Sequence, residues 1–486
     1  MAITQQSLID SVPTGLLVGG EWREASGGAR FDVHDPATGE TLTTCADGTP
    51  EDGMAALAAA HAAQAEWAAT APRDRGEILR RAFEAITGRA DEFATLMTLE
   101  MGKTLAEARG EVTYGAEFFR WFSEESVRVH GRYSVAPNGA TRLLTMKQPV
   151  GPTLMITPWN FPLAMGTRKM GPAIAAGCTM VVKPAHETPL TMLLLAEVLQ
   201  ECGLPAGVLN VVTTTHSGAV CEPVIRDERL RKLTFTGSTA VGKVLVEQSA
   251  EQLLRVSMEL GGNAPFLVFE DADVDAAVEG AMLAKMRNIG EACTAANRFF
   301  AHESVADEFA SKLAARMGGL TVGKGTEDGV DVGPLITAKA RDGVHELVED
   351  AVGRGAKVLT GGAPVPGEGY FYEPTVLAEV PAGSRCLTEE IFGPVAPVCT
   401  FSDEADAVAK ANGTEYGLVG YVYTRDNARV LRVAEAMEFG MIGVNTGIVS
   451  NPAAPFGGVK QSGFGREGGF EGIDEYLEVK YVGIAL

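Results

Sequence analysis

Residues 151–184, GPTLMITPWNFPLAMGTRKMGPAIAAGCTMVVKP, place two short apolar runs on either side of a stretch rich in alanine and glycine. The apolar runs are typical of strands buried on both faces, and residues 164–177 between them predict a helix that packs through small side chains. A strand, a helix and another strand in this order form a βαβ unit with parallel strands. We therefore expect a parallel sheet covered by helices to begin here.

The same alternation continues along the chain. A helix is predicted over 190–203, strands over 207–213 and 230–238, a helix over 239–250 and a strand over 253–262. A second alternating set runs from Ala264 to about Asn445, and apolar residues three or four apart between Leu79 and Met97 predict helices upstream. Because 486 residues exceed what one hydrophobic core usually supports, we expect an α/β protein with two domains.

The charge and cysteine content exclude several classes of protein. The sequence carries 41 Lys and Arg against 63 Asp and Glu, a net charge of -22 that repels nucleic-acid phosphates and anionic membranes. It contains no apolar run of the roughly 18 residues that a membrane span needs, and its first residues show no basic cluster followed by an apolar run, so we expect no signal peptide. The seven cysteines are odd in number, scattered and never arranged as CxxC. We expect a cytoplasmic protein with free thiols, no metal, and no nucleic-acid or membrane partner.

Two segments fall outside both alternating sets. Residues 131–149, GRYSVAPNGATRLLTMKQP, predict a β-hairpin because Asn138-Gly139 supplies the positive φ angles that a two-residue turn requires. Residues 474–486 at the end of the chain are also strand-like. Protruding strands leave unpaired edges that another subunit often covers, so these segments predict a homo-oligomer, a dimer or a tetramer, with its interface here.

One cysteine differs from the other six in its surroundings. In NIGEACTAANR, residues 288–298, Gly290, Ala292 and Ala295 leave room beside the sulfur of Cys293 for an incoming carbon atom. An isolated intracellular cysteine is more often an inert packing residue. A nucleophilic role also requires activation by a base, a helix start or a cation, because a free thiol with a pKa of about 8.5 is largely protonated at pH 7.

The sequence offers a carboxylate rather than a histidine as the activating base. None of the seven histidines lies in a comparable motif near Cys293, which disfavours a cysteine hydrolase. Glu259 lies in an apolar, strand-like run between Met258 and Leu260, just before Gly261 and Gly262. It is either a solvated residue at a strand end or a partly desolvated base, whose raised pKa would let it activate a thiol or a water molecule.

Asn160, in TPWNFPL, is the candidate oxyanion donor. It follows a buried-type strand and lies between Pro158 and Pro162, where the backbone is too constrained for a helix. An asparagine in a turn usually has a structural role. Here the rigid surroundings suit an amide that stabilises an oxyanion, an interaction whose loss typically costs about 10²- to 10³-fold in rate.

TFTGSTAVGKV, residues 234–244, is the candidate phosphate-binding element. Helix amino termini attract phosphate through free N–H groups and the helix dipole. The segment from Gly237 to Lys243 matches the first part of a P-loop, but Val244 stands where magnesium coordination needs serine or threonine, which disfavours an NTPase. A dinucleotide with its pyrophosphate at this helix start is consistent with the motif.

Together these motifs resemble the NAD(P)-dependent aldehyde dehydrogenases over essentially all 486 residues. The resemblance rests on TPWNFPL, VVKPAHETP, FTGSTAVG, MELGGNAP, GEACTAANR, EEIFGPV and the late motif PFGGVKQSGFGREGG. It implies two Rossmann-type parallel-sheet domains with a β-strand oligomerisation arm. The implied division is a dinucleotide-binding domain over 1–130 and 149–260, a catalytic domain with the thiol over 261–466, and oligomerisation segments over 131–148 and 467–486.

The resemblance also implies roles for the candidate residues. Cys293 is expected to be the nucleophile, Glu259 the general base, and Asn160 the oxyanion donor together with the Cys293 N–H. The thioester formed on Cys293 is expected to be hydrolysed to a free acid, because relatives that transfer the acyl group to coenzyme A typically lack this glutamate. The residues expected to bind the cofactor are Thr157, Trp159, Lys183, Ala185, His186, Gly237, Ser238, Gly242, Glu390 and Phe392.

The cofactor preference depends on residue 186. By resemblance Lys183 binds the adenosine ribose, and relatives that prefer NAD often carry a glutamate three residues later, which repels a 2′-phosphate. That position is His186 here, and an imidazole tolerates the phosphate and attracts it when charged. His186 is alternatively a solvated loop residue, and Glu187 beside it restores a preference for NAD if it turns inward. We expect NADP, with NAD as the alternative.

Within the family, the sequence is most similar to the succinate-semialdehyde dehydrogenases, through RNIGEACTAANR and the ending PFGGVKQSGFGREGGFEGIDEYLEVKYV. Arg168 and Arg287 lie close in sequence to Asn160 and Cys293, and a guanidinium binds a carboxylate through two parallel hydrogen bonds. We expect both arginines, with Ser450, to bind the distal carboxylate of a short ω-oxo acid. In the alternative, either arginine pairs with a structural Asp or Glu.

Other functions stay open at this point. Pocket depth decides between succinic semialdehyde and a longer ω-semialdehyde such as glutarate semialdehyde. A non-catalytic, crystallin-like member of the fold is disfavoured because Asn160, Glu259 and Cys293 are all present. Some relatives carry a second cysteine two residues after the nucleophile, whereas this chain has Ala295, so no inactivating disulfide is expected there.

Overall fold

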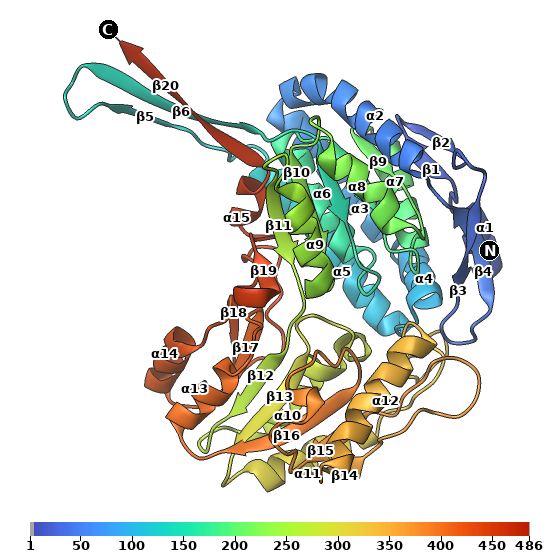
Figure 1. Cartoon of the computed structure of the whole chain (residues 1–486), viewed down its shortest axis with the longest axis vertical. Helices are drawn as coiled ribbons and strands as arrows, with labels where there is room; N and C mark the ends of the chain where they lie inside the picture. Colours follow the sequence, from blue (N-terminus) through green and yellow to red (C-terminus); the bar gives the residue numbers. More distant parts are fainter. Residues whose placement is uncertain (1–3, 486) are drawn as a thin grey trace.

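The first alternating set forms an eight-stranded sheet in the upper lobe of the computed structural model, which describes residues 4–485 (Figure 1). Its strands in spatial order are β19 (Gly463–Phe464), β11 (Arg255–Glu259), β10 (Lys232–Thr236), β7 (Thr153–Ile156), β8 (Met180–Lys183), β9 (Leu209–Val211), β1 (Leu16–Val18) and β2 (Glu21–Arg23). The five strands from β11 to β9 run parallel, as expected. Residues 1–3 and 486, which the expected domain ranges include, lie outside the description.

Helices cover both faces of this sheet because side chains alternate along each strand. Met155 packs into the core on one face, whereas Leu154 and Ile156 pack on the other. The first face carries α3 (Pro72–Gly88), α4 (Ala90–Met101), α5 (Leu105–Glu125), α6 (Ala164–Ala176) and α7 (Leu190–Glu201), and the second carries α2 (Pro50–Ala69), α8 (Ser217–Arg226) and α9 (Thr239–Ser249).

The sequence interpretation omitted α8, which connects β9 to β10. Parallel neighbours in a sheet need a crossover, and this helix supplies it. The signal was present in the sequence, because Val220, Cys221, Val224 and Ile225 follow helical spacing and are all buried. Pro223 inside the helix and the short apolar stretch hid it.

The second alternating set forms a seven-stranded sheet in the lower lobe (Figure 1). Its neighbouring strands run parallel, apart from the antiparallel pair at one edge. In spatial order they are β14 (Lys357–Thr360), β15 (Thr375–Ala378), β16 (Val395–Phe401), β13 (Ala296–His302), β12 (Ala264–Val268), β17 (Val419–Tyr423) and β18 (Met441–Val444). The associated helices are α10 (Val274–Met286), α11 (Ala306–Gly318), α12 (Ala338–Gly353), α13 (Glu404–Asn412) and α14 (Asn427–Ala436).

The chain passes between the lobes twice near the proposed domain limits. β11 ends at Glu259 in the first sheet and β12 begins at Ala264 in the second. Near the end of the chain, Gly463 and Phe464 of β19 return to pair with β11. The remaining elements are α1 (Gln5–Ser11), the hairpin β3 (Arg30–His34) and β4 (Thr41–Ala46), the short helix α15 (Glu471–Asp474), and the 3₁₀ turns η1 (Arg287–Gly290), η2 (Arg385–Leu387) and η3 (Lys460–Ser462).

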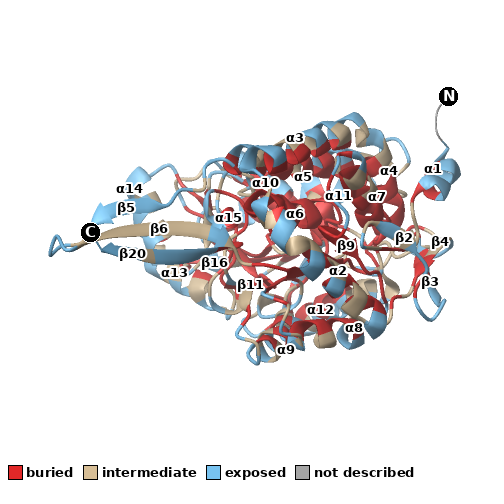
Figure 2. Cartoon of the chain, turned by 90° about the horizontal axis from the view of Figure 1, so that it is seen from above, coloured by how far each residue is buried: buried red, intermediate tan, exposed pale blue. Residues whose placement is uncertain are grey.

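A three-stranded arm projects from the upper lobe (Figure 1). β5 (Arg132–Val135) and β6 (Thr141–Pro149) form the expected hairpin, and β20 (Leu477–Ala485) pairs with the other edge of β6. The turn is longer than the expected two residues. The last hydrogen bond of the hairpin joins the Ala136 N–H to the Thr141 carbonyl, and of the pair Asn138-Gly139 only the glycine has a positive φ, of 75°. Figure 2 shows these strands exposed or half-buried beside the buried core.

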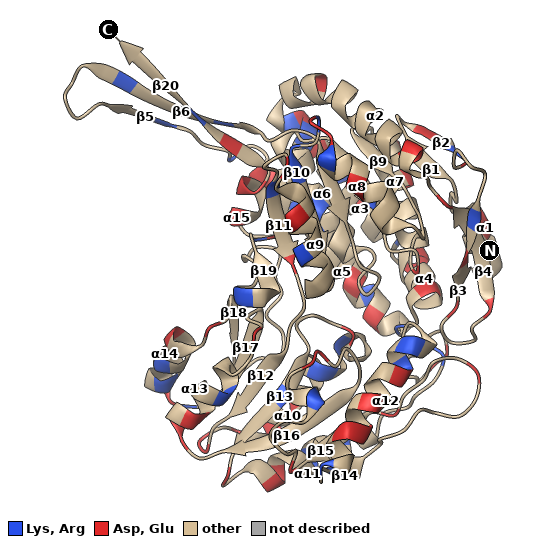
Figure 3. Cartoon of the chain, in the orientation of Figure 1, with Lys and Arg blue, Asp and Glu red and all other residues tan. Residues whose placement is uncertain are grey.

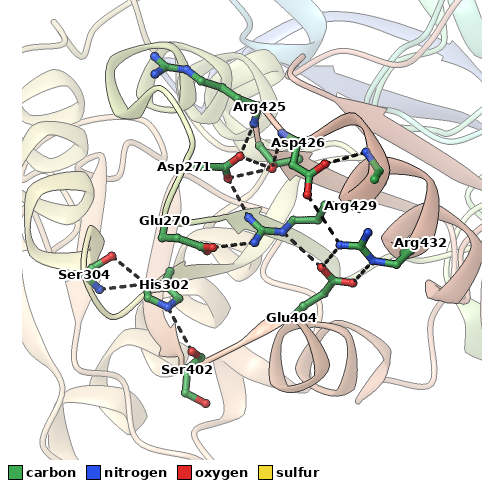
Figure 4. Close-up of polar contacts among 12 residues, drawn as sticks. Glu270, Asp271, His302, Ser304, Ser402, Glu404, Arg425, Asp426, Arg429 and Arg432 are labelled. Atoms are coloured by element: carbon green, nitrogen blue, oxygen red, sulfur yellow. Dashed lines mark hydrogen bonds and ion pairs between the residues drawn. The ribbon is translucent and has the colours of Figure 1, made fainter.

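Charged residues of both signs are spread over both lobes (Figure 3). The densest ionic cluster lies where β12 and β17 end (Figure 4). Arg429 of α14 donates hydrogen bonds to Glu270 at 2.6 Å, Asp271 at 2.8 Å and Glu404 at 3.3 Å, and Arg432 shares Glu404. The cluster ties α13 and α14 to the sheet. Within residues 4–485 every helix is too short or too polar to cross a bilayer.

Both parallel sheets reverse their strand order at one place, which fixes where a ligand crevice opens. In the first sheet this place lies between β7 and β10, and in the second between β12 and β17. Ligands of open α/β sheets bind outside the carboxyl ends of the strands at such a point. In the first sheet, residues 157–160 follow β7 there and Gly237 follows β10. In the second sheet, the Arg429 cluster occupies the equivalent place.

Candidate active site

Cys293 lies where the two lobes meet, on the segment between η1 and β13. This segment has an unusual backbone: Asn288, Ile289 and Gly290 have φ angles of 56°, 63° and 79°. Only glycine adopts such angles without strain, and a β-branched isoleucine there is a rare outlier. Fixed partners hold the turn in place, since Asn288 donates from its backbone N–H to Glu107 at 2.6 Å and from its side chain to the carbonyl oxygens of Asn160 and Glu291.

Asn160 is immobilised beside the cysteine by contacts from both lobes. Its backbone carbonyl accepts hydrogen bonds from Lys103 at 2.8 Å and from Asn288 at 3.0 Å. Its side-chain Nδ2 donates to the Glu291 carbonyl at 2.9 Å. An amide nitrogen carries two N–H groups, so this bond orients the side chain and leaves the second N–H for a ligand. The Cys293 N–H has no hydrogen-bond partner among residues 4–485.

The environment of Cys293 keeps its thiol protonated in this state. Burial raises the pKa of Cys293 to about 12, and the carboxyl groups of Glu390 and Glu259 add to the increase. The guanidinium groups of Arg168 and Arg287 act in the opposite direction without reversing it. Since the thiolate is the nucleophile, the protein needs a proton acceptor close to the sulfur.

Glu259 is the buried carboxyl that the sequence offered as one of two alternatives. It ends β11 with 2 % of its surface exposed, and neither side-chain oxygen has a hydrogen-bond partner within the described chain. Burial and the neighbouring Glu467 raise its pKa well above the usual range, whereas Arg168 and Lys169 lower it. A carboxyl group in such surroundings is protonated near neutral pH and becomes a strong base when it loses its proton.

Glu467 is a functional candidate that the sequence interpretation missed. It accepts charged hydrogen bonds from Arg168 and Lys169, adjacent residues of α6, and all three are buried. Burial alone would raise its pKa, but the two cations lower it to about 2. Two consecutive cations within a helix of small apolar residues signalled a buried carboxylate partner, although the sequence did not reveal which one.

Arg168 therefore has the structural carboxylate partner that the sequence left open as its alternative. One of its donors remains free: Nη2 is buried and has no partner in residues 4–485. The guanidinium also lies over the Phe456 ring, with 4.0 Å to the ring centroid. A buried unpaired donor is costly, and a ligand oxygen would satisfy it.

The expected adenosine end of the cofactor site centres on Lys183. Its ammonium is buried, pairs with no carboxylate within 4.0 Å in the described chain, and donates to Ser217 at 2.9 Å. Burial lowers its pKa. Beside it Thr157 and Ala185 are buried, whereas His186 is half exposed and lies 3.2 Å from Glu187. Glu187 thus faces the imidazole, and Ser217 is a contact that the sequence interpretation did not include.

The glycines of the expected pyrophosphate segment are required by close packing. A Cβ at Gly237 would lie 2.4 Å from the Phe235 ring, and one at Gly242 would lie 2.5 Å from the Leu260 side chain. Ser238 caps the amino terminus of α9, accepting from the Val241 N–H at 3.4 Å. Helix amino termini attract anionic groups, and we expect this one to do so.

The expected nicotinamide end brings residues of both lobes together. Glu390 accepts from the Gly262 N–H at 3.0 Å, and burial raises its pKa to about 7. Gly262 also packs on Cys293, because a Cβ there would lie 2.3 Å from the Cys293 carbonyl oxygen. Phe392 meets Trp159 edge to face, with ring centroids 5.4 Å apart, which joins the lobes across the site.

Arg287 and Ser450, expected to bind the substrate, line one cavity of about 320 Å³. Its wall also includes Tyr114, Phe161, which follows Asn160, and Asn288 of the turn that precedes Cys293. The Arg287 side chain forms no hydrogen bond and no ion pair within residues 4–485. The cavity therefore presents an unpaired cation and a hydroxyl group. No group of three acidic, His or Cys side chains in the described chain is arranged to hold a metal ion.

The raised pKa of Cys293 predicts how its reactivity depends on pH. Below a pKa of about 12 the thiolate fraction grows about tenfold per pH unit, so alkylation by iodoacetamide should accelerate steadily between about pH 7 and pH 10. Loss of activity and mass spectrometry follow the reaction, and Cys293→Ala corrects for the other cysteines. A rate that levels off near pH 7 would contradict the half-buried, neutral thiol.

Replacing Glu467 with glutamine should lower the pKa of Glu259. The change removes a negative neighbour and leaves Arg168 and Lys169 to stabilise the Glu259 carboxylate, so the acid limb of the pH–rate profile should move to lower pH by roughly one unit or more. Loss of the buried pairs should also reduce the free energy of unfolding by roughly 3–5 kcal/mol. Glu279→Gln, at an exposed pair with Arg316, is the matched control. An unmoved acid limb in Glu467→Gln would disprove the coupling.

Comparisons with known proteins agree with this geometry. The aldehyde dehydrogenase family matches residues 22–482. A succinate-semialdehyde dehydrogenase of Paenarthrobacter nicotinovorans is 64% identical over 444 residues, 91% of this chain and 99% of the relative. A glutarate-semialdehyde dehydrogenase of Pseudomonas putida is 50% identical, covering 96% of this chain and 97% of the relative. The crystal structure of an NADP-dependent enzyme of Escherichia coli superimposes with a TM-score of 0.96 at 49% identity, covering 98% of both chains. This chain belongs to the aldehyde dehydrogenase family.

Proposed function

We propose that this enzyme oxidises succinic semialdehyde to the free acid, with NADP as its preferred cofactor. The observation that carries the proposal is the unpaired Arg287 guanidinium in the wall of the cavity that it shares with Ser450. In a protein with a net charge of -22, a cation without a carboxylate partner beside the nucleophile suits a substrate that brings its own carboxylate. The P. nicotinovorans relative carries the name of this activity.

In the proposed mechanism Cys293 Sγ bonds to the aldehyde carbon after losing its proton to a base, for which Glu259 is our candidate. The Asn160 Nδ2–H and the Cys293 N–H stabilise the resulting oxyanion. When bound, NADP supplies the hydride acceptor that converts this adduct to a thioester. Glu259 then takes a proton from water, the hydroxide attacks the thioester carbonyl, and the Sγ–C bond breaks to release the acid and the thiolate.

The residues of this chain fit a dinucleotide at the crevice of the first sheet. Lys183 is buried without a carboxylate partner in the described chain, so its ammonium group is able to bind an anionic or hydroxyl group of a ligand. The glycines before and in the first turns of α9 let this helix pack closely against Phe235 and Leu260. We propose that Thr157, Trp159, Ala185 and Ser238 complete this end, and that Glu390 and Phe392 hold the nicotinamide end.

The preference for NADP rests on His186 and Glu187. Glu187 Oε2 lies 3.2 Å from His186 Nδ1, so the carboxylate that would favour NAD is engaged by the imidazole. A protonated imidazole paired in this way still leaves Nε2 to donate to a 2′-phosphate. The E. coli neighbour is described as NADP dependent, which supports the same choice. NAD remains the alternative cofactor.

Glutarate semialdehyde is the second candidate substrate. The cavity of about 320 Å³ is larger than a chain of four carbons and larger than one with a further methylene. The P. putida relative carries the name of that activity. Lengthening the chain by one methylene changes binding by only about 1 kcal/mol in an apolar pocket, so both aldehydes are expected to react.

The assay that tests this function measures reduced cofactor with succinic semialdehyde, with NADP and NAD in separate reactions. We expect faster turnover with NADP, no turnover for Cys293→Ala, and a KM about 10- to 100-fold higher for Arg287→Ala, since a charged hydrogen bond contributes roughly 1.5–3 kcal/mol. Arg316→Ala, at an exposed pair with Glu279, is the control. An unchanged KM in Arg287→Ala would reject the carboxylate site, and faster turnover with NAD would reject the cofactor assignment.

We also propose the division into domains and the assembly. The two sheets support a dinucleotide-binding domain over 1–130 and 149–260 and a catalytic domain over 261–466. The arm, over 131–148 and 467–486, carries apolar side chains on its surface, among them Tyr133, Val135 and Val479. Such side chains on a protruding sheet suit burial against another subunit. Seven unpaired cysteines suit the reducing cytoplasm.

The arm predicts the result of a light-scattering experiment. The wild-type protein should have the mass of a dimer or a tetramer, and Tyr133→Glu with Val135→Glu should reduce that mass, because charges replace apolar side chains that are 66% and 52% exposed. Val358→Glu changes a valine that is 42% exposed in β14 and should leave the mass unchanged. A monomeric wild-type protein at micromolar concentration would refute the proposed interface.

A further inference from the structure

The Arg287 guanidinium packs against two aromatic rings. Its Cζ lies 5.4 Å from the centroid of Tyr114 and 5.1 Å from the centroid of Phe161. Tyr114 belongs to α5 and Phe161 to the segment after β7, so two separate elements of the first lobe hold a side chain that the second lobe supplies. Both rings and the guanidinium line the same cavity.

These contacts hold the cation without using its hydrogen-bonding capacity. Aromatic rings attract a guanidinium through its flat face, and its N–H groups at the edge stay available. An Asp or Glu partner would hold Arg287 equally well but would occupy those donors and neutralise the charge. The two acidic side chains in the cavity wall are committed elsewhere: Glu107 accepts from the backbone N–H groups of Asn288 and Thr104, and Glu111 pairs with Lys103.

Phe161 connects this arrangement to the oxyanion donor. It directly follows Asn160, and Lys103 Nζ lies 4.3 Å from the Phe161 ring centroid while donating to the Asn160 carbonyl. The ring is therefore fixed by the same lysine that fixes the catalytic segment. Tyr114 in turn meets Phe118 edge to face at 5.0 Å, which orients it on α5.

We propose that Tyr114 and Phe161 form an aromatic clamp that presets Arg287 for the distal carboxylate of the substrate, so that both aromatics are specificity-positioning residues. The inference rests on the proposed function and extends it to residues that no charge or hydrogen bond marks. Holding the guanidinium before the substrate arrives removes part of the ordering cost of binding, which improves affinity for the carboxylate.

The test compares succinic semialdehyde with butanal, an uncharged aldehyde of equal chain length. Tyr114→Leu should raise the KM for succinic semialdehyde roughly 3- to 30-fold, the range expected for a partly desolvated cation–π contact. The loss for butanal should be smaller, so the ratio of the two kcat/KM values falls. Tyr114→Phe keeps the ring and should restore the ratio. Tyr114→Met repeats the test if the leucine variant does not fold, because methionine has a volume similar to that of leucine but a more flexible side chain.

A matched control lies outside the cavity. Arg120, also on α5, lies 5.5 Å from the Phe83 ring centroid, so Phe83→Leu removes an aromatic partner from an arginine elsewhere. This variant should leave the ratio at its wild-type value. A change there as large as in Tyr114→Leu would mean that the ratio reports general destabilisation, and the clamp would be rejected.

The remaining outcomes separate the clamp from the function on which it rests. An unchanged ratio in Tyr114→Leu, together with a raised KM in Arg287→Ala, would reject the clamp and keep the carboxylate site. Equal losses for both aldehydes would show that Tyr114 is only structural. A wild-type enzyme that does not prefer succinic semialdehyde over butanal would reject the proposed function, and the clamp with it.

Discussion

The site depends on the burial of Glu259 without a hydrogen-bond partner. A carboxyl group in this position is tolerated only while it stays neutral, because an isolated buried carboxylate is very costly. The two nearby cations, Arg168 and Lys169, form ion pairs with another acid, Glu467, and not with Glu259. The lowered pKa of Glu467 keeps it ionised, whereas the raised pKa of Glu259 favours its protonated form. One sequence thus places two acids close together with widely separated pKa values, the arrangement that assigns acid and base roles in enzymes.

The same division of charge affects the nucleophile. Cys293 lies close enough to Arg168 for the guanidinium to lower its pKa, yet burial prevails and the thiol stays protonated. If Arg168 were not shared with Glu467, its full charge would favour both the thiolate and the Glu259 carboxylate in the resting protein. A permanently ionised thiol is the form that oxidants attack. The buried Glu467 pair therefore favours a protonated, protected thiol at Cys293.

The two lobes use their sheets in different ways, although both sheets reverse their strand order at one place. In the first sheet, the crevice at the carboxyl ends of β7 and β10 is lined by Asn160 and by glycines, and it is open to a cofactor. In the second sheet, Arg429 and three carboxylates fill the equivalent crevice (Figure 4). The second lobe therefore contributes Cys293 from the amino ends of its strands, on the turn that precedes β13. The carboxyl ends of the strands in the first sheet thus lie near the amino end of β13 in the second, which brings the thiol and the cofactor crevice together.

Local patterns in the sequence predicted what local physics determines. The strands around residues 153–156 and 180–183 follow from continuous apolar runs, and the open space around Cys293 follows from its small neighbours. The partners of Arg168 and Arg287 did not follow, because Glu467 lies 299 residues from Arg168 and two rings from different elements surround Arg287. The same role was predicted for both arginines, but their surroundings in the fold differ. Arg168 is buried against an acid with one donor left over, whereas Arg287 keeps its charge unpaired, because its partners are aromatic.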